Sequence, residues 1–213
     1  KHGMNLRVKQ KELSLEMLRA LQENKLALCE AEVGTGKTHA YILALTVYNI
    51  YLGRKVPAVI STSTIALQKA LTEEYIPQIS GILLEHHIID KPLSFVVRKG
   101  KQHYVCDSRL KIYETAIINL QREADADLIL ELERLGENGD DRIDLDDASL
   151  TPYVKGRINV FHCNRSCPYS VLCRFMNFKK KCMTGSFDFQ ITNHNYIPVS
   201  YTHLRAHETL MNL

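Results

Sequence analysis

Residues 31 to 38 have the composition of a loop that holds phosphate. The segment reads Ala31-Glu-Val-Gly34-Thr35-Gly36-Lys37-Thr38. Glycines let successive backbone N–H groups curl around a phosphate, a lysine reaches the β and γ oxygens, and a threonine hydroxyl can hold Mg²⁺. The general pattern begins with glycine, where this chain has Ala31. The segment predicts an ATP·Mg²⁺ site lined by Gly34, Thr35 and Gly36, with the chemistry carried by Lys37 and Thr38.

Four cysteines form the second group of residues that could do chemistry. Cys163, Cys167 and Cys173 lie within eleven residues, and Cys106 lies upstream. Four thiolates suit either a [4Fe–4S] cluster or tetrahedral zinc, and the spacing alone does not choose between them. Gaps of three and five residues favour iron–sulfur mildly, because zinc sites favour Cys-x-x-Cys pairs. Of the other two cysteines, Cys29 is expected to be a small hydrophobe in a buried strand, and Cys182 is left out of the ligand set.

Charge is divided unevenly along the chain. The formal net charge is +3, but residues 123 to 147 hold eleven acids and two bases, which leaves 25 bases and 13 acids elsewhere, a net +12. We interpret the acidic run as a solvated helix end and loop. Bases and aromatic residues gather near the cysteines and predict a surface for single-stranded nucleic acid: Arg98, Lys99, Lys101, Tyr104, Arg109, Lys111, Arg165, Tyr169, Arg174, Phe175, Phe178 and Lys179 to Lys181.

Short apolar strands alternate with amphipathic helices along the chain, which predicts an α/β fold with a parallel sheet and covered faces. Helices are expected over residues 10–24, 37–52, 64–75 (ending before Pro77) and 107–135, and strands over 26–31, 58–62, 93–98 and 188–192. The gap between the last two strands is too long for a connection in a compact sheet. We therefore predict a first domain over 1–98, an inserted, mostly helical four-cysteine subdomain over 99–185, and a return strand within 186–198.

Composition excludes several classes of protein. With 45% hydrophobic and 24% charged residues the chain is neither disordered nor collagenous. The longest apolar stretch, residues 40 to 52, is shorter than the roughly 20 residues that a membrane span needs. The N-terminus has no apolar signal region, so we expect a cytoplasmic protein without a membrane partner. Lys1 suggests a fragment. Residues 199–213 look like a non-native tail, for which we expect no fixed structure.

Taken in order, the motifs resemble the XPD/DinG family of superfamily 2 iron–sulfur DNA helicases. Residues 30–38 resemble its motif I, residues 61–68 its motif Ia, and Thr192-Asn-His its return to the first motor domain. Arg7 and Gln10 resemble the start that contacts adenine in that family. Lys99-Gly-Lys-Gln-His-Tyr-Val-Cys106 resembles the start of the cluster domain, and Cys163, Cys167 and Cys173 match its remaining ligands.

The resemblance implies a RecA-like P-loop motor with helices on both faces of the sheet, interrupted by an iron–sulfur subdomain. It implies a monomeric ATP-dependent helicase that unwinds DNA 5′ to 3′, binds single-stranded or forked DNA and serves DNA repair. The family's Asp-Glu-Ala-His box and second motor domain are not in this sequence, so we expect weak or no ATP turnover from this chain itself. The alternatives are a non-catalytic nucleotide- and nucleic-acid-binding module with zinc, and a metabolic P-loop kinase or transport ATPase.

Overall fold

The computed structural model describes residues 7–53, 57–119, 126–137, 143–161, 163, 167–184, 187–194 and 210–212. The chain divides into two compact units, and each is described by itself. Unit 1 comprises Lys1–Arg98 and Gly185–Leu213, and unit 2 comprises Lys99–Thr184. No helix within these described residues is long and apolar enough to cross a membrane.

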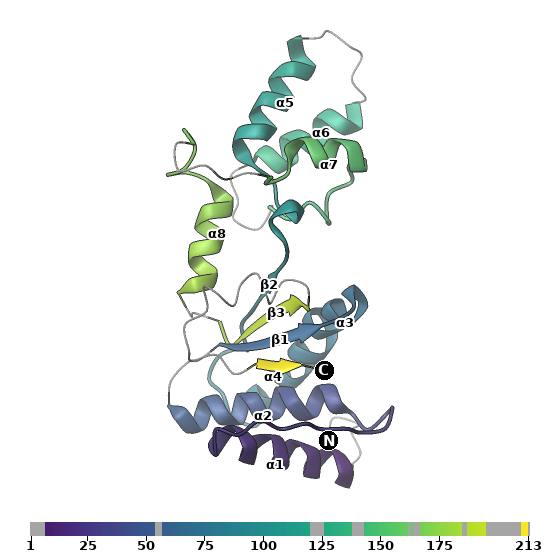
Figure 1. Ribbon diagram of the computed structural model, residues 1–213, viewed down its shortest axis with the longest axis vertical. Coiled ribbons are helices and arrows are strands. Elements are labelled where there is room, and N and C mark those ends of the chain that lie inside the picture. Colours follow the sequence, from purple (N-terminus) through teal and green to yellow (C-terminus); the bar gives the residue numbers. More distant parts are fainter. Residues whose placement is uncertain are drawn as a thin grey trace. The chain divides into compact units, whose positions relative to one another are not determined.

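Unit 1 is an α/β unit built on a parallel sheet, as predicted (Figure 1). Its helices are α1 (Val8–Gln22), α2 (Lys37–Leu52), α3 (Ile65–Ala70), the π-helix η1 (Leu71–Tyr75) and α4 (Ile76–Glu85). Its strands are β1 (Ala58–Thr62), β2 (Phe95–Arg98), β3 (Phe189–Asn193) and β4 (Leu210–Asn212). The strand order is β2-β3-β1-β4, and all three neighbouring pairs are parallel. This arrangement is compatible with a RecA-like fold.

The two faces of the sheet differ in character. Side chains alternate along a strand, and the register pairs Ala58 with Phe189 and Ile60 with Ile191. These four residues join α2, η1 and α4 in one apolar core. The alternate residues of β1 and β3 are also buried but include the polar side chains of Ser61, Gln190 and Thr192. In the described residues, apolar helix side chains therefore pack against one face of the sheet.

The helix predicted to end before Pro77 continues as α4 to Glu85. Pro77 falls in the first turn of α4, where a missing N–H costs least. Before it, η1 changes the spacing of the buried residues, so that Leu71 and Ile76 are five positions apart yet share the core. A π turn closes i→i+5 hydrogen bonds and so suits this spacing.

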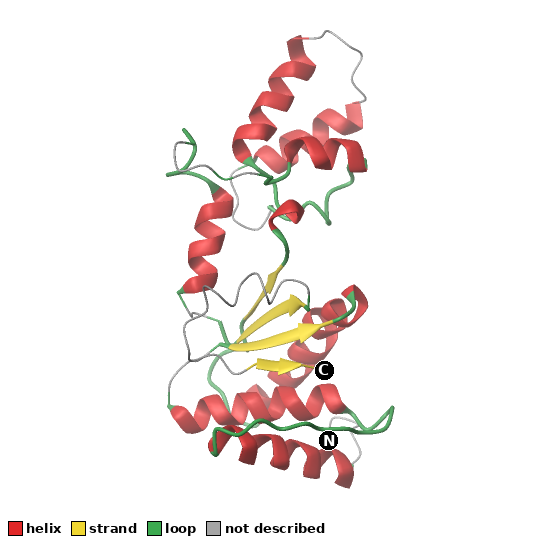
Figure 2. Ribbon diagram, viewed as in Figure 1, coloured by secondary structure: helices red, strands yellow, loops and turns green. Residues whose placement is uncertain are grey.

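The strand predicted over residues 26–31 is wrong. Figure 2 shows the connection between α1 and α2 as loop. Leu26 is 97% exposed and Leu28 is 101% exposed. A strand forms only by pairing with another strand, and the described pairings, of β1 with β3 and β4 and of β2 with β3, do not involve residues 26–31. Cys29 is consequently exposed and is not the buried hydrophobe that we expected. Residues 210–212 form β4, although we expected no fixed structure beyond residue 198.

Unit 2 is mostly helical around its own apolar core. It contains a 3-10 turn, η2 (Lys101–His103), and the helices α5 (Asp107–Asn119), α6 (Ala126–Gly136), α7 (Pro152–Ile158) and α8 (Arg174–Met183). The single helix expected over 107–135 is thus two helices, and residues 120–125 lie outside the described residues. Tyr104, Val105, Leu110, Leu132 and Ile158 are among the buried residues of this core.

Candidate functional site

The glycine loop, residues 31–38, turns tightly before α2. Gly34 and Gly36 have φ of +83° and +82°, a left-handed conformation that favours glycine. A Cβ placed on Gly36 would also overlap the side-chain amide of Gln10. The Thr35 hydroxyl donates to the Glu32 carbonyl at 2.7 Å, which closes the turn. Glycine at position 36 is therefore favoured by the backbone angle, and a side chain there would also displace the Gln10 amide.

Lys37 and Thr38 are the first two residues of α2. The first turn of a helix carries backbone N–H groups without helical acceptors and a partial positive charge. Lys37 Nζ donates to the Ala31 carbonyl at 2.8 Å, so the ammonium group bends back across the loop. The ammonium group and the positive helix terminus thus gather at one end of α2, an arrangement suited to an anion.

Arg7 and Gln10 from the start of α1 brace this loop. Arg7 Nη1 donates to the Gly34 carbonyl at 2.6 Å, and Gln10 Nε2 donates to the Gly36 carbonyl at 3.0 Å. One turn later, the Ser14 hydroxyl donates to the Ala40 carbonyl at 3.1 Å. These two predicted site residues therefore contact the loop backbone, while their contact with adenine stays a prediction.

Two segments singled out by the resemblance meet at the carboxyl ends of β1 and β3. Ser61 Oγ lies 2.7 Å from the ring Nδ1 of His194. The backbone N–H of His194 donates to the Thr62 carbonyl at 3.0 Å. The Thr64 hydroxyl accepts from the Leu67 N–H and caps α3. Sequence reasoning missed the Ser61–His194 pair. The available signal was that each residue lies at the end of a buried strand, and parallel strands bring such ends to one edge.

The cysteine set occupies the start of α5 and the segment before α8. Cys106 immediately precedes α5, Cys173 is the N-cap of α8, and Cys163 and Cys167 lie in the connection that leads to α8. Cys163 is an exposed residue, but partial desolvation of its thiol raises its pKa, and the neighbouring thiols of Cys173 and Cys106 raise it further. Burial also raises the pKa of Cys173. The four thiols are therefore near enough to influence one another.

Ligand geometry is a stricter condition than proximity. Within the part of the chain that the structure describes, no group of three or more His, Cys, Asp or Glu residues is arranged to hold a metal ion. His162 and residues 164–166, which flank Cys163, lie outside that part. The donor set fits a soft metal by its chemistry, since thiolate is the preferred ligand of iron–sulfur clusters and of structural zinc.

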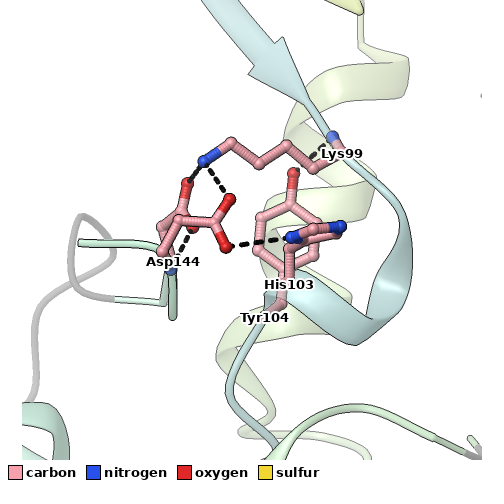
Figure 3. Close-up of polar contacts among 5 residues, drawn as sticks. Lys99, His103, Tyr104 and Asp144 are labelled. Carbon is pink, nitrogen blue, oxygen red and sulfur yellow. Dashed lines mark hydrogen bonds and ion pairs between the residues drawn. The ribbon is translucent and has the colours of Figure 1, made fainter. Parts of the chain in front are cut away.

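Lys99 is held in an ion-pair cluster (Figure 3). Its ammonium group lies 2.5 Å from Asp144 and 2.9 Å from Asp146, and His103 Nδ1 lies 3.0 Å from Asp146. The Lys99 backbone N–H donates to the Tyr104 hydroxyl at 2.9 Å. Burial acts to lower the pKa of Lys99, but the two carboxylates outweigh it and the pKa is raised. Our interpretation of the acidic run as only solvated is thus wrong for these two aspartates.

Three arginines that we assigned to nucleic acid have structural partners, and one of them, Arg98, donates from Nη1 to Gln190 Oε1 at 2.6 Å in unit 1. Arg174 is 8% exposed, and its Nε donates to Asp107 at 2.8 Å while its Nη1 donates to the Leu135 carbonyl at 2.6 Å. Arg109 donates to the Asn159 and Gly156 carbonyls at 3.0 and 3.2 Å. The guanidinium groups of Arg174 and Arg109 link helices and loops of unit 2, so the predicted surface is smaller than the sequence suggested.

The aromatic residues divide in the same way. Phe175 and Phe178 pack on the buried Tyr104, with ring centroids 5.4 and 5.1 Å apart, and are core residues. Tyr169 is 38% exposed and remains able to stack on a base. The bases of the predicted surface that are exposed in the structure are Lys101, Lys111, Lys179, Lys180 and Lys181. Arg165 lies outside the described residues.

Comparison with known proteins gives the site its context. No family model matches the chain. The chain is 33% identical over 127 residues to the 3′-5′ exonuclease DinG of Staphylococcus saprophyticus, covering 56% of this chain and 13% of that protein. It is 33% identical over 90 residues to the ATP-dependent DNA helicase DinG of Photobacterium profundum, covering 42% and 12%. A 3′-5′ exonuclease DinG of Staphylococcus epidermidis is 36% identical over 105 residues, covering 48% and 11%. The matched part is thus about an eighth of each curated relative, and the similarity supports the DinG family for this sequence.

Proposed function

We propose that this chain is the nucleotide-binding part of a DinG-like, ATP-dependent DNA helicase. The observation that supports this most directly is the glycine loop: two left-handed glycines, a lysine folded across the loop and the positive end of α2. In the proposal, loop N–H groups and Lys37 hold the β- and γ-phosphates, and Thr38 holds Mg²⁺. Arg7 and Gln10 fix the loop and lie on the adenine side.

For DNA we propose a single strand, followed in the 5′-to-3′ direction. At the polar end of the sheet the half-buried His194, whose Nδ1 lies 2.7 Å from the buried Ser61 Oγ, offers its ring to a backbone. Lys179 to Lys181 and Tyr169 offer charge and a stacking face in unit 2. Some relatives are named as helicases and others as exonucleases. We propose the helicase, because a glycine loop at the start of a helix suits the phosphates of a nucleotide.

For the cysteine set we propose a [4Fe–4S] cluster held by Cys106, Cys163, Cys167 and Cys173. The mutual influence of their thiols supports the grouping, because a bound cation would stabilise thiolates that otherwise repel one another. Such a cluster would fix the connection between α5 and α8. A zinc site in a non-catalytic nucleotide- and nucleic-acid-binding module remains the second candidate, since zinc accepts the same four ligands.

The first experiment measures binding of fluorescent ATP, with Mg²⁺, to this chain and to Lys37→Ala. We expect at least a tenfold loss of affinity for Lys37→Ala with unchanged binding of single-stranded DNA. Lys25→Ala, which removes an exposed lysine paired with Glu23, is the matched control. In a longer protein that carries this sequence, Lys37→Ala should abolish unwinding. Retained unwinding would contradict the proposal.

The metal is identified by measuring iron, sulfide and zinc in anaerobically purified protein. About four irons per chain with a brown colour would support the cluster, as a four-thiolate cubane holds four. Stoichiometric zinc without iron would instead favour the binding module.

A further inference from the structure

Tyr41 carries a buried hydroxyl that the proposed function does not use. The residue lies in α2, its side chain is 0% exposed, and it belongs to the apolar core of unit 1. In the described part of the structure its Oη has no hydrogen-bond partner. Buried hydroxyls are usually paired because water can no longer satisfy them. A buried hydroxyl without a completed bond therefore needs an explanation.

The nearest functional neighbour of this hydroxyl is Thr38. The two residues are three positions apart on α2, so their side chains lie on the same side of the helix. Burial raises the pKa of Tyr41 well above its ordinary value, and an interaction with the Thr38 hydroxyl partly opposes that rise. Thr38 is half-buried at the mouth of the glycine loop, whereas Tyr41 is enclosed behind it. Thr38 is therefore the loop residue that lies one helical turn from Tyr41 and interacts with its hydroxyl.

Tyr41 is also held firmly in place. The π-helix η1 ends at Tyr75, whose ring meets His39 of α2 edge to face at 5.1 Å. His39 Nε2 lies 3.1 Å from Gln78 Oε1 in α4. The first turns of α2 are thus fixed against η1 and α4, and the Tyr41 ring is packed in the same core.

We propose that Tyr41 is a positioning residue for Mg²⁺: the Thr38 O–H donates to Tyr41 Oη, which leaves the lone pairs of Thr38 Oγ1 facing the metal. A threonine hydroxyl has one proton and two lone pairs, so it can bind a cation well only if its proton points elsewhere. A cation also makes the bound hydroxyl a stronger donor, which strengthens the bond to Tyr41. The inference rests on the proposed function, because it assumes that Thr38 binds Mg²⁺.

The test compares the chain with its Tyr41→Phe variant, which keeps the ring and removes the hydroxyl. ATP binding is measured twice, with excess Mg²⁺ and with EDTA. We expect Mg·ATP affinity to fall about threefold to tenfold, the size of one neutral hydrogen bond, and the affinity in EDTA to stay within about twofold. In a Thr38→Ala background, Tyr41→Phe should cause no further loss. Tyr48→Phe, a half-buried tyrosine farther along α2, is the matched control and should bind Mg·ATP like the unchanged chain.

The outcomes separate the two proposals. Equal loss with Mg²⁺ and with EDTA would mean that Tyr41 only shapes the loop, and no loss in either condition would mean that its hydroxyl has no role; both overturn the inference. The thermal midpoint of Tyr41→Phe should match or exceed that of the unchanged chain, because the variant removes a buried hydroxyl that makes no completed bond. If the unchanged chain does not bind Mg·ATP, the proposed function itself fails.

Discussion

The glycine loop and the cysteine set differ in the groups that would bind a ligand. The loop presents mainly backbone groups, and its shape follows from two glycines, the start of α2 and the hydrogen bonds of Arg7 and Gln10. The cysteine set is made of side chains from segments some sixty residues apart, with flanking residues outside the described part. A backbone site can form before its ligand arrives, whereas a thiolate site depends on the metal to offset the repulsion of its ligands. On the proposed function, the glycine loop is the preformed site and the cysteine set is the one that a bound metal would complete.

The largest expected effect comes from removing one thiol. Cys167→Ser should lose the bound metal and most hydrogen-exchange protection in unit 2, because metal binding contributes on the order of 10 kcal/mol to folding in small metal domains. Mg·ATP affinity should stay within about twofold. Cys29→Ser, at an exposed cysteine of unit 1, is the control and should keep the metal. Full metal content in Cys167→Ser would remove this residue from the ligand set.

Arg174→Ala should have the next largest effect, by destabilising unit 2. Its ion pair with Asp107 is largely buried, with side-chain exposures of 10% and 16%, and breaking such a pair costs about 3–5 kcal/mol. Urea unfolding would measure the loss. Arg134→Ala removes an exposed partner of Glu131 at 3.5 Å and should cost less than about 0.5 kcal/mol. Weakened DNA binding with unchanged stability would instead assign Arg174 to nucleic acid.

Gly36→Ala tests whether the loop is preformed. A side chain at φ +82° costs roughly 1–2 kcal/mol and would also displace Gln10. Gly53→Ala is a matched control, since Gly53 has φ +61° but nothing near its Cβ position. Both variants should lose stability in thermal unfolding, but only Gly36→Ala should weaken Mg·ATP binding. Equal nucleotide affinity in the two variants would argue against a fixed loop.

The smallest expected effect is a change in stability at acidic pH. The hydrogen bonds of Asp146 with His103 and Lys99 outweigh its burial and lower its pKa below the ordinary 3.8. A carboxyl with a lowered folded-state pKa stabilises the protein above its unfolded pKa and loses that contribution as the pH falls through the folded value. Asp146 is 41% exposed, so the contribution should stay below about 1 kcal/mol. The stability difference between the unchanged chain and Asp146→Asn should be largest above the ordinary pKa of 3.8 and shrink as the pH falls through the lower folded-state pKa. A difference that does not shrink in acid would exclude this origin.

Local signals predicted most of unit 1. The apolar runs at β1 and β3 and the helix at Lys37–Leu52 agree with the structure to within a residue, because each combines a clear apolar run with a local start or stop. The prediction of a strand over residues 26–31 failed although this run is also apolar, because a strand depends on pairing with a distant strand, which no local pattern reveals.

Side-chain partners were harder to predict than elements. Lys99, Arg109 and Arg174 looked like a nucleic-acid surface because they lie near the cysteines in sequence, but their partners come from positions about 40 to 70 residues away. The sequence shows where a charged residue lies in the chain, but it does not show whether a distant carboxylate or carbonyl binds that residue. The same limit hid the Ser61–His194 pair, whose members are 133 positions apart.

The π turn at Leu71–Tyr75 sets the rotational phase of α4. One residue advances an α-helix by about 100°, so the extra residue of a π turn rotates α4 by that angle about the helix axis relative to an unbroken helix. Deleting one residue between Thr72 and Tyr75 would restore regular hydrogen bonds, yet it would turn Ile76, Ile79 and Leu83 away from the sheet. The length of this turn, as well as the identity of its residues, therefore determines whether the apolar side chains of α4 face the core.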